Sequence, residues 1–531
     1  MEKNLYSIFN DVFGPVMIGP SSSHTAGPAR IGKVIHMLLN DRVTRIRIIF
    51  DVNGSYINCY TTQGTNYGFV GGIQGIDITD ERIKNALAIA EENGVAVSFE
   101  SEDFGSVHPN FARIIVEGSS GEQVMTESIS TGGGMFDITN YNGFPLVIKG
   151  DCYNVLVTTT DKELAKAVEE RMAALKDNTY LIETIPAPEG EEYLINVRLE
   201  EDVDAALIEE LSGLAGVVRV RLVKPVLPVV KRFHLDVPFS NAREAEDYAQ
   251  RSGRSLWEIG LDYECALSGQ TPQQLMERME EIVCIMREEG ENSLAGKMDR
   301  RGFMTPKGKL MKENMERGEI KTIGIGLCDR VVLVATAVEE YNVCRGKIVA
   351  APTGGSCGIV PGAVVALGDD LGIDNREIAK AMFAAGIVGV FFANSATFGA
   401  EVAGCQAEVG ASSSIAAGGV AHYLGATVAQ GFAAASAAIQ NLMGLICDPI
   451  TGIGNIPCVT RNALGAVNAV VSANMVVLGF DPFVPLDEAV ESMLHVGELM
   501  PREHRCTQLG GICATNCAKR AFALLEKGEQ Q

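Results

Sequence analysis

Gly404-Cys405-Gln406-Ala407-Glu408-Val409-Gly410 is followed, after a long uncharged run, by Cys447-Asp448-Pro449 and by Pro457-Cys458-Val459-Thr460-Arg461-Asn462. The three cysteines stand beside Gly, Pro, Asp and Asn, which are residues of turns rather than of apolar helical faces. Three thiolates directed from turns at one centre can hold a [4Fe–4S] cluster that leaves one iron open as a Lewis acid. The alternative is three buried thiols that only pack, because the spacings are longer than those of ferredoxins and zinc sites.

Two long uncharged runs, residues 381–400 and 410–447, lie around the first of these cysteines. Their length would permit membrane spans, but both are rich in Gly, Ala, Ser and Asn, and basic flanks and aromatic belts are missing. Helices with small residues on every face fit the inside of a helical domain or a subunit interface better. We therefore predict an all-α domain over residues 226–531 that carries the cluster.

The composition places the chain among globular proteins with more than one domain. It has 531 residues, 47% of them hydrophobic, and a formal net charge of −23. So acidic a chain is not expected to bind nucleic acid or an anionic membrane surface. The first residues lack the apolar region of a signal peptide, and 13 cysteines in a chain this long indicate thiols or ligands rather than a disulfide framework. We expect a cytoplasmic protein.

Residues 1–150 have the pattern of an α/β domain. A polar turn, Ser21-Ser22-Ser23-His24-Thr25, precedes a helix with apolar positions from Ile31 to Leu38. Hydroxyl and free backbone N–H groups at such a turn suit a carboxylate or phosphate, although the turn can also be a plain helix cap. A glycine turn at Gly132–Gly134 allows close approach of a ligand or of another segment, which makes Gly133 a candidate contact.

Residues 151–225 show a β-α-β-β-α-β order, which is the order of a ferredoxin-like sandwich such as an ACT regulatory module. Such a module either binds a small effector or only forms a dimer interface. The predicted strands are 153–159, 179–185, 192–199 and 217–223, and the predicted helices are 161–175 and 202–214. Pro225 and Pro228 mark the linker that follows. The sequence thus predicts an α+β multidomain fold of three parts.

A second loop of small residues, Ala351–Pro361, leads into a helix and contains Thr353, Gly354, Gly355 and Ser356. Its backbone N–H groups can receive an anion. A pyridoxal-phosphate cradle is an alternative interpretation, but no convincing lysine for a Schiff base accompanies it.

Together these motifs resemble those of the iron–sulfur L-serine dehydratases. The resemblance runs through almost the whole chain and implies that the family's β part, an ACT-like module and its α part are fused. It rests on GPSSSHTAGP (residues 19–28), the glycine turn, SLWEIGLDYE (255–264), APTGGSCGIVP (351–361), AGCQAEVG (403–410), GLICDPITG (444–452) and IPCVTRNA (456–463).

The resemblance assigns roles to individual residues. It implies Cys405, Cys447 and Cys458 as ligands of a [4Fe–4S] cluster, with Cys357 only lining the site. His24 is the implied base or acid, since the unperturbed pKa of histidine lies near working pH, and Gln63 is the second catalytic candidate. The implied substrate contacts are Ser21, Ser22, Ser23, Thr25, Thr65, Gly133, Thr353, Gly354, Gly355, Ser356, Asn394 and Arg461.

Three departures from the family's pattern bear on the substrate. Gln63 stands where relatives carry a second histidine, and the segment beginning at Asn394 loses a serine. Cys506 replaces a glutamate of the family's motif near the C-terminus. Relatives can cap the fourth iron with a C-terminal cysteine, but residues 528–531 contain none. Cys506 is therefore a possible fourth ligand, against the alternative that Cys506, Cys513 and Cys517 are ordinary thiols.

The expected function is cluster-dependent β-elimination, which converts L-serine to a 2-oxo acid and ammonia. The altered motifs leave open L-cysteine desulfidation or dehydration of another β-hydroxy amino acid. A non-catalytic, cluster-bearing sensor is the alternative from another class. Small-residue helical faces predict a homo-oligomer, a dimer or larger, with a small amino acid as the only other partner.

Overall fold

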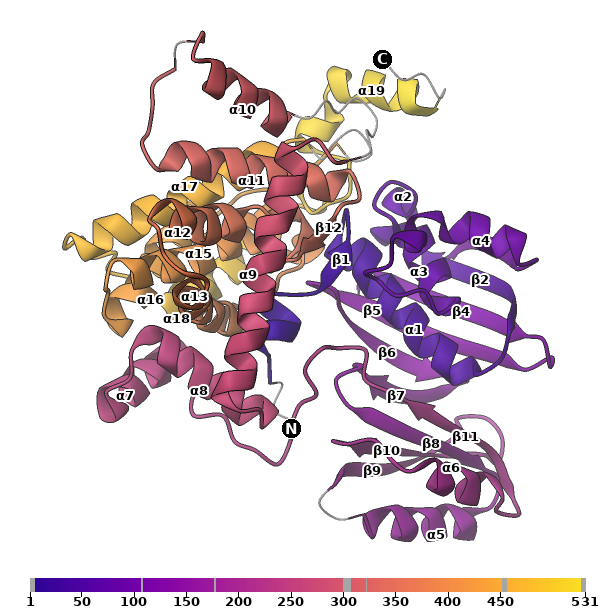
Figure 1. Cartoon of the computed structure of the whole chain (residues 1–531). Helices are drawn as coiled ribbons and strands as arrows, with labels where there is room; N and C mark the ends of the chain where they lie inside the picture. Colours follow the sequence, from indigo (N-terminus) through magenta and orange to yellow (C-terminus); the bar gives the residue numbers. More distant parts are fainter. Residues whose placement is uncertain are drawn as a thin grey trace.

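A computed structural model describes residues 5–106, 108–175, 178–298, 307–320, 322–450 and 456–526. Figure 1 shows three parts: a sheet domain, a smaller α/β unit packed at one end of it, and a group of helices beside both. The chain is therefore a mixed α/β multidomain protein. Residues 528–531, in which the sequence offers no cysteine as a fourth ligand, lie outside the described residues.

The sheet domain is built on six strands in the order β3-β2-β4-β5-β6-β7, with only the β2–β3 pair parallel. Alternate residues of β4 and β5 are buried, which is the period of a sheet with one face against a core. The strands are β2 (Val43–Asp51), β3 (Ala96–Glu102), β4 (Phe111–Gly118), β5 (Gln123–Gly132), β6 (Met135–Tyr141) and β7 (Phe144–Ile148). The helices are α1 (Gly27–Leu39), α2 (Tyr56–Cys59), α3 (Thr65–Ile73) and α4 (Ala86–Glu92), with the short turn η3 (Glu81–Asn85).

Glycines let α1 and α3 pack backbone against backbone. A Cβ on Gly72 would lie 2.1 Å from the carbonyl oxygen of Ala29, and one on Gly32 would lie 2.7 Å from that of Phe69. Larger side chains would force the helices apart. This close packing fixes the start of α1, and with it the serine-rich turn that precedes the helix.

Residues 8–12 belong to the core of the helical part. The turn η1 (Ile8–Val12) is buried, and Gly386 and Gly389 leave room for Ile8 and Val12. The short strand β1 (Val16–Ile18) then pairs antiparallel with β12 (Lys347–Val349). The prediction of an all-helical part after residue 226 therefore differs from the structure at β12.

Residues 153–223 form a four-stranded antiparallel sheet in the order β11-β8-β10-β9, with two helices. The elements are β8 (Tyr153–Thr159), α5 (Lys162–Ala173), β9 (Thr179–Pro186), β10 (Tyr193–Leu199), α6 (Ala205–Ser212) and β11 (Val217–Val223). Asp161 and Asp204 cap the two helices by accepting hydrogen bonds from backbone N–H groups of the first turn.

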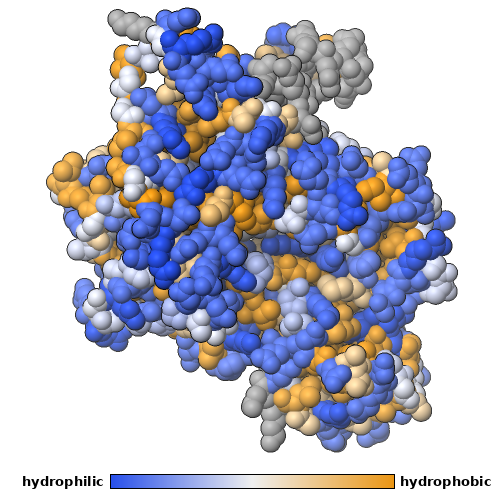
Figure 2. All heavy atoms as spheres, in the orientation of Figure 1, coloured by the Kyte–Doolittle hydropathy of each residue, from blue (hydrophilic) through white to orange (hydrophobic). Residues whose placement is uncertain are grey.

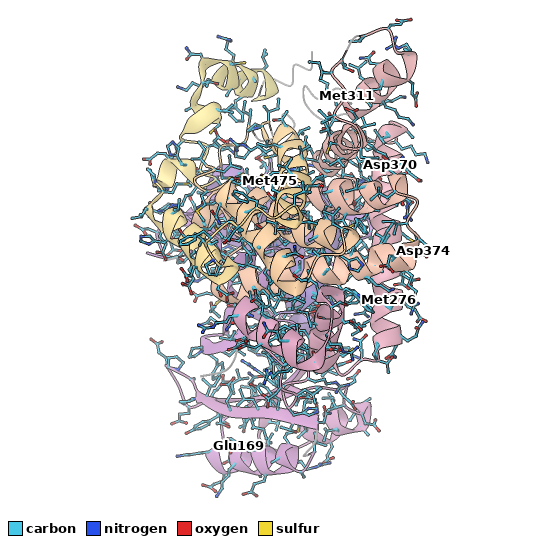
Figure 3. The ribbon with its side chains drawn as sticks, turned by 90° about the vertical axis from the view of Figure 1, so that its left-hand side faces the viewer. Glu169, Met276, Met311, Asp370, Asp374 and Met475 are labelled. Atoms are coloured by element: carbon cyan, nitrogen blue, oxygen red, sulfur yellow. The ribbon has the colours of Figure 1, made fainter. Side chains whose placement is uncertain are left out.

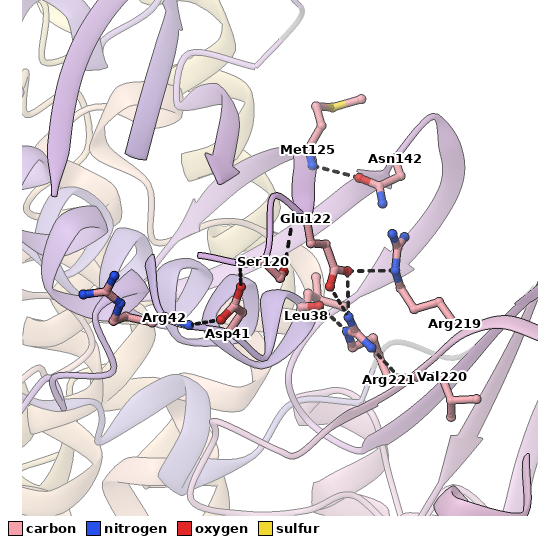
Figure 4. Close-up of polar contacts among 10 residues, drawn as sticks. All are labelled: Leu38, Asp41, Arg42, Ser120, Glu122, Met125, Asn142, Arg219, Val220 and Arg221. Atoms are coloured by element: carbon pink, nitrogen blue, oxygen red, sulfur yellow. Dashed lines mark hydrogen bonds and ion pairs between the residues drawn. The ribbon is translucent and has the colours of Figure 1, made fainter. Parts of the chain in front are cut away.

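Charged groups hold this unit to the sheet domain (Figure 4). Glu122, just before β5, accepts from Arg219 at 2.8 Å and from Arg221 at 2.6 Å, both on β11. The Nε of Arg221 also donates to the carbonyl oxygen of Leu38 at 2.6 Å. After β11, Lys231 forms a buried ion pair of 3.0 Å with Asp151. Burial alone would raise the pKa of Asp151, but the charge of Lys231 and its hydrogen bond lower it.

The remaining part is helical apart from β12. Its helices are α7 (Ala242–Ser252), α8 (Leu256–Ser268), α9 (Pro272–Leu294), α10 (Lys307–Arg317), α11 (Cys328–Val343), α12 (Leu367–Asp370), α13 (Asn375–Ser395), α14 (Ala400–Ala403), α15 (Val409–Tyr423), α16 (Val428–Gln440), α17 (Cys458–Val477), α18 (Leu486–Leu499) and α19 (Asn516–Glu526). Short turns are η5 (Gly354–Ser356), η6 (Pro361–Ala366), η7 (Cys405–Ala407), η8 (Arg502–His504) and η9 (Gly511–Ala514).

The uncharged runs form the centre of this helical part. Of the described helices only α13 is long and apolar enough to cross a membrane, and 83% of its most apolar window is buried inside the fold. Gly418 and Gly419 of α15 approach the backbone of α13. Asp374, labelled in Figure 3, caps α13 by accepting from the N–H of Glu377 at 2.9 Å. Most of the face drawn in Figure 2 is hydrophilic, in keeping with helices that bury their apolar residues.

Candidate active site

Four cysteines converge where the helical part meets the sheet domain. Cys405 begins η7, Cys458 begins α17, and Cys447 and Cys506 lie in irregular segments. Their exposed fractions are 1%, 5%, 3% and 6% in that order. The Cys405 side chain is hydrogen-bonded to both Cys447 and Cys458, and Cys447 also contacts Cys506. The structure thus brings together the three predicted ligands and the possible fourth.

Backbone pairing places Cys506 beside Cys447. The N–H of Cys447 donates to the carbonyl oxygen of His504 at 2.9 Å, and the N–H of Cys506 donates to that of Cys447 at 3.0 Å. Cys506 has φ +59°, a left-handed conformation that a non-glycine residue rarely adopts. Such strained backbone is often found at functional sites. Here it turns the chain just after the paired segment.

The electrostatics of Cys405, Cys447 and Cys458 favour one thiolate. Hydrogen bonds from Cys447 and then from Cys458 lower the pKa of Cys405 well below its usual value, and the charge of Arg461 acts in the same direction. The hydrogen bond to Cys405 raises the pKa of both Cys447 and Cys458. One Cys405 thiolate therefore lies beside two neutral thiols. Cysteine ligands are expected in this state before a metal binds and displaces the remaining protons.

Arg461 serves the cysteine segments. Its Nη1 donates to the carbonyl oxygen of Ile446 at 3.0 Å, and its Nη2 lies 2.9 Å from the Asp448 carboxylate. Both partners flank Cys447. Since its charge also stabilises the Cys405 thiolate, Arg461 lies at the predicted site but is engaged by protein groups.

His24 is buried in the turn η2 (Ser22–Ala26), with 1% of its surface exposed. Its Nδ1 lies 2.8 Å from the Ser23 hydroxyl, its Nε2 lies 3.2 Å from the Ser55 hydroxyl, and the Tyr56 ring packs edge-on at 5.1 Å. Burial lowers the pKa of His24 to about 3. The pKa of His24 thus lies below the unperturbed value of histidine, because the ring has lost its water without gaining a carboxylate partner. His24 is therefore neutral at working pH, and burial disfavours its charged form.

Ser55 and Gln63 connect His24 to the thiols. The Ser55 hydroxyl donates to the carbonyl oxygen of Cys506 at 3.4 Å, and the Gln63 Nε2 donates to the Cys506 sulfur at 3.7 Å. Thr25 binds the backbone of Gln63, since the Thr25 hydroxyl donates to the Gln63 main-chain carbonyl oxygen at 2.7 Å. The buried Thr65 hydroxyl has no partner among the described residues. Of the predicted residues of this segment, Gln63 thus contacts the thiol cluster directly and Thr25 contacts Gln63.

The loop Thr353–Ser356 binds to the serine-rich turn. The N–H of Gly354 donates to the Ser22 hydroxyl at 3.2 Å, and Asn342 donates to the carbonyl oxygens of both Pro20 and Gly354, at 2.9 and 2.7 Å. A Cβ on Gly355 would lie 3.1 Å from both carboxylate oxygens of Glu408. A larger residue at this position would therefore push the Glu408 carboxyl group away from the loop by a few tenths of an ångström.

Two other predicted contacts differ in position. A Cβ on Gly133 would lie 3.4 Å from the carbonyl oxygen of Pro352, so the glycine turn touches the loop just described. Asn394 lies near the end of α13 and donates to the carbonyl oxygen of Ser240 at 2.8 Å. No contact of Asn394 with the thiols is found in the described part of the chain. The structure does not bring it to the site.

Three carboxyl groups, those of the buried Glu339 and Glu401 and of the half-buried Glu408, and Ser55 were not anticipated from the sequence. One Glu408 oxygen lies with the sulfurs of Cys405 and Cys447 in a group whose atoms are all within 4.8 Å, a possible metal site. Burial and the Cys405 charge raise the pKa of Glu408 well above its usual value. Glu408 stands in the cysteine motif itself, which was the available signal. Glu401, which accepts from Asn110, and Glu339 carry no such local signal.

Glu339 is fully buried on α11. It accepts from the Cys357 thiol at 3.3 Å, and its other oxygen has no partner among the described residues. Burial raises its pKa to about 8, so the group is mostly protonated at neutral pH. Cys357 therefore bonds a carboxyl group, and the described contacts give it no bond to the four clustered thiols, consistent with a lining residue.

A cavity of about 260 Å³ adjoins the site. Ser55, the residue between His24 and Cys506, forms part of its wall, and so do His108, Glu401, Arg502, Arg505 and Thr507. Two arginines at its rim suit a small anionic molecule. The cavity meets the candidate site at Ser55, whose hydroxyl contacts both His24 and the carbonyl oxygen of Cys506.

Comparison with known proteins matches both halves of the chain. Residues 243–513 match a family model described as serine dehydratase alpha chain. A probable L-serine dehydratase alpha chain of Bacillus subtilis is 31% identical over 277 residues, which are 52% of this chain and 92% of that one.

The beta chain of the probable L-serine dehydratase of the same organism is 39% identical over 215 residues, or 40% of this chain and 96% of that one. L-serine dehydratase 2 of Escherichia coli is 34% identical over 287 residues, or 52% of this chain and 61% of that one. One chain is thus similar to both separate chains found in Bacillus subtilis.

Proposed function

This chain belongs to the serine dehydratase family, and we propose that it is an iron–sulfur-dependent lyase that deaminates L-serine to pyruvate and ammonia. One observation carries the proposal: four buried thiols lie together, one of them favoured as a thiolate, and Ser55 links Cys506 to the buried His24. A purely structural cluster would not need the histidine or the loops.

The donor set fits a [4Fe–4S] cluster. Cys405, Cys447 and Cys458 would hold it, with Cys506 as a fourth ligand in the resting state, and soft thiolates are the usual ligands of such clusters. When bound, a cluster with an open iron supplies a Lewis acid for the leaving group. Glu408, beside Cys405 and Cys447, is a possible alternative to Cys506 as the fourth ligand and would bind through a carboxylate oxygen.

The chain's own groups would bind and orient the amino acid. Hydroxyl and backbone N–H groups of the Ser21–Thr25 turn and of the Thr353–Ser356 loop lie side by side, since Gly354 donates to Ser22. These groups suit the substrate carboxylate. The loops and helices that bury them exclude water, which strengthens each of these interactions.

His24 would accept the proton from the α-carbon as the β-hydroxyl leaves. Its ring is already neutral and is oriented by Ser23 and Ser55. Loss of the proton and of hydroxide amounts to loss of water and gives aminoacrylate, which tautomerises to an imine. Water then hydrolyses the imine to pyruvate and ammonia, so that the atoms balance.

The same chemistry on another amino acid is the second candidate. Gln63, the residue that departs from the family's histidine, contacts the Cys506 sulfur in the middle of the site. A changed residue there can re-specify the leaving group, for example to hydrosulfide in an L-cysteine desulfidase. The cluster-bearing sensor remains a third outcome of the test below.

The test uses protein purified without oxygen. Iron and sulfide are quantified with the visible spectrum, and 2-oxo acid and hydrosulfide release is measured with serine, threonine and cysteine. We expect four irons and four sulfides per chain, with pyruvate formed from serine. A full cluster with hydrosulfide from cysteine alone would select the second candidate, and a full cluster without turnover would select the sensor. Protein that binds no iron under reconstitution would contradict all three.

We further propose three domains, with boundaries at 1–150, 151–225 and 226–531, of which the second is ACT-like. The ACT-like assignment of the second domain is supported by its β-α-β-β-α-β order and by the strand order β11-β8-β10-β9. The position of η1 in the helical core means that the first domain would dock through its own N-terminus.

We also propose that the protein is a homodimer or larger, through α17. Leu464, Val471 and Met475 form an apolar stripe at helical spacing and are 55%, 45% and 39% exposed. In a strongly acidic chain, an uncharged stripe of this kind fits a second copy of itself.

Light scattering tests this dimer. Met475→Glu is expected to lower the measured mass to that of one chain, because it places a charge in the stripe. Met315→Glu, at a methionine 47% exposed on α10, is the matched control and should leave the mass unchanged. A single-chain mass for the unmutated protein would contradict the proposal.

A further inference from the structure

Two adjoining cavities, of about 290 and 420 Å³, lie away from the thiols, between α1, α9 and the linker that follows β11. Arg30, Asp77, Ile78, Pro225 and Val226 form walls of both. Figure 1 shows the chain leaving β11 at this junction of the three parts. Neither cavity shares a wall residue with the cavity beside His24.

Arg30 is the notable residue of these walls because it is charged and only 4% exposed. Both of its hydrogen bonds use Nη1, which donates to the carbonyl oxygen of Gly134 at 2.8 Å and to the Met135 sulfur at 3.8 Å. In the described part of the chain, Nε and Nη2 have no acceptor. Burial lowers its pKa to about 10, which still leaves it charged at neutral pH.

The carboxylates near Arg30 do not satisfy these donors. The charges of Asp11 and Asp77 act on Arg30, but no hydrogen bond joins either to it among the described residues. Asp11 instead accepts from the N–H of Ser7, and Asp77 accepts from Thr79. These two donors face the cavities, whose walls include Arg30, so a ligand there that supplied acceptors would gain charge-assisted hydrogen bonds.

Other positive charges surround the same space. Lys33, one helical turn after Arg30, and Lys224 line the smaller cavity, and Arg278 lines the larger. The acidic residues of the walls are Asp77 and Glu281, and Lys224 is itself paired with Asp202 at 2.7 Å, so the excess rests on Arg30, Lys33 and Arg278. In a chain of net charge −23, this local excess of positive charge favours an anion.

We propose that these cavities bind a small anion with a carboxylate or phosphate group, held by the free edge of the Arg30 guanidinium. Nε and Nη2 lie on one edge of the planar group and match two oxygens of either anion. The cavity volumes are those of sites for small molecules. The ligand would touch the residue that fixes Gly134 in the glycine turn, so the site lies next to, but outside, the candidate active site.

Isothermal titration calorimetry with the full-length protein tests the proposal. Succinate and inorganic phosphate are titrated separately, which distinguishes the two anion classes. We expect saturable binding of at least one of them, weakened about tenfold or more in Arg30→Met, since charge-assisted hydrogen bonds are lost. Arg45→Met, at an arginine whose side chain is 56% exposed on β2, is the matched control and should bind as the unmutated protein does.

A second variant guards against loss of structure in Arg30→Met. Ile78→Trp is expected to fill both cavities, because Ile78 lines both, without removing a charge. Circular dichroism establishes that each variant is folded. The assignment of this site is wrong if neither anion binds to the unmutated protein. It is also wrong if the Arg30→Met and Ile78→Trp variants bind the anions as tightly as the unmutated protein does.

Discussion

Replacing Cys405 with serine is expected to give a folded protein that binds little or no iron and has no detectable turnover. Cys405 contacts both Cys447 and Cys458 and is the thiol most readily ionised, so its loss removes the centre of the donor set. Serine keeps the size of the side chain but offers a hard oxygen where soft thiolate is required. Iron content, the visible spectrum and pyruvate release measure the effect.

Two further cysteine variants make this result specific. Cys284→Ser, at an exposed cysteine on α9, should keep full iron content and activity. Cys506→Ser separates a resting ligand from an obligatory one, and we expect it to retain the cluster with an altered spectrum. Full iron content in Cys405→Ser would remove Cys405 from the ligand set and the proposed cluster geometry with it.

Replacing His24 with alanine is expected to lower kcat by ~10²–10⁴-fold, the usual contribution of a general base. The cluster should stay intact, because the hydrogen bonds of His24 go to Ser23 and Ser55 and not to a cysteine sulfur. The spectrum therefore separates loss of the base from loss of the cofactor. Stopped assays of pyruvate at saturating serine give the comparison.

His495→Ala is the matched control, since that histidine lies on α18 with 70% of its side chain exposed. It should keep the turnover of the unmutated protein. An undiminished kcat in His24→Ala with a full cluster would show that another group takes the α-proton.

Much of the architecture could be predicted because local pattern and structure agree. The strand 43–51, the β-α-β-β-α-β order and the buried uncharged helices follow from hydrophobic period and turn residues alone. The pairing of β1 with β12 could not be predicted. Each strand has three residues, too few for a period, and their partners lie in distant parts of the sequence.

The candidate site divides in the same way. Cys405, Cys447 and Cys458 stand in motifs with unusual residues, so the sequence marks them. Glu339 carries no such mark, because what makes it unusual is complete burial beside Cys357, which only the tertiary structure creates. The pKa of His24 likewise depends on burial by Ser55 and Tyr56, so its type alone was misleading.

The burial of η1 in the helical core has a consequence for synthesis on the ribosome. Phe9 packs edge-on against Phe383 of α13, and Ile8 and Val12 fit against glycines of the same helix. The apolar side chains of η1 therefore cannot pack, and remain uncovered, until α13 has left the exit tunnel. During that interval the nascent chain is exposed to aggregation and is a natural client for a chaperone that binds short apolar segments.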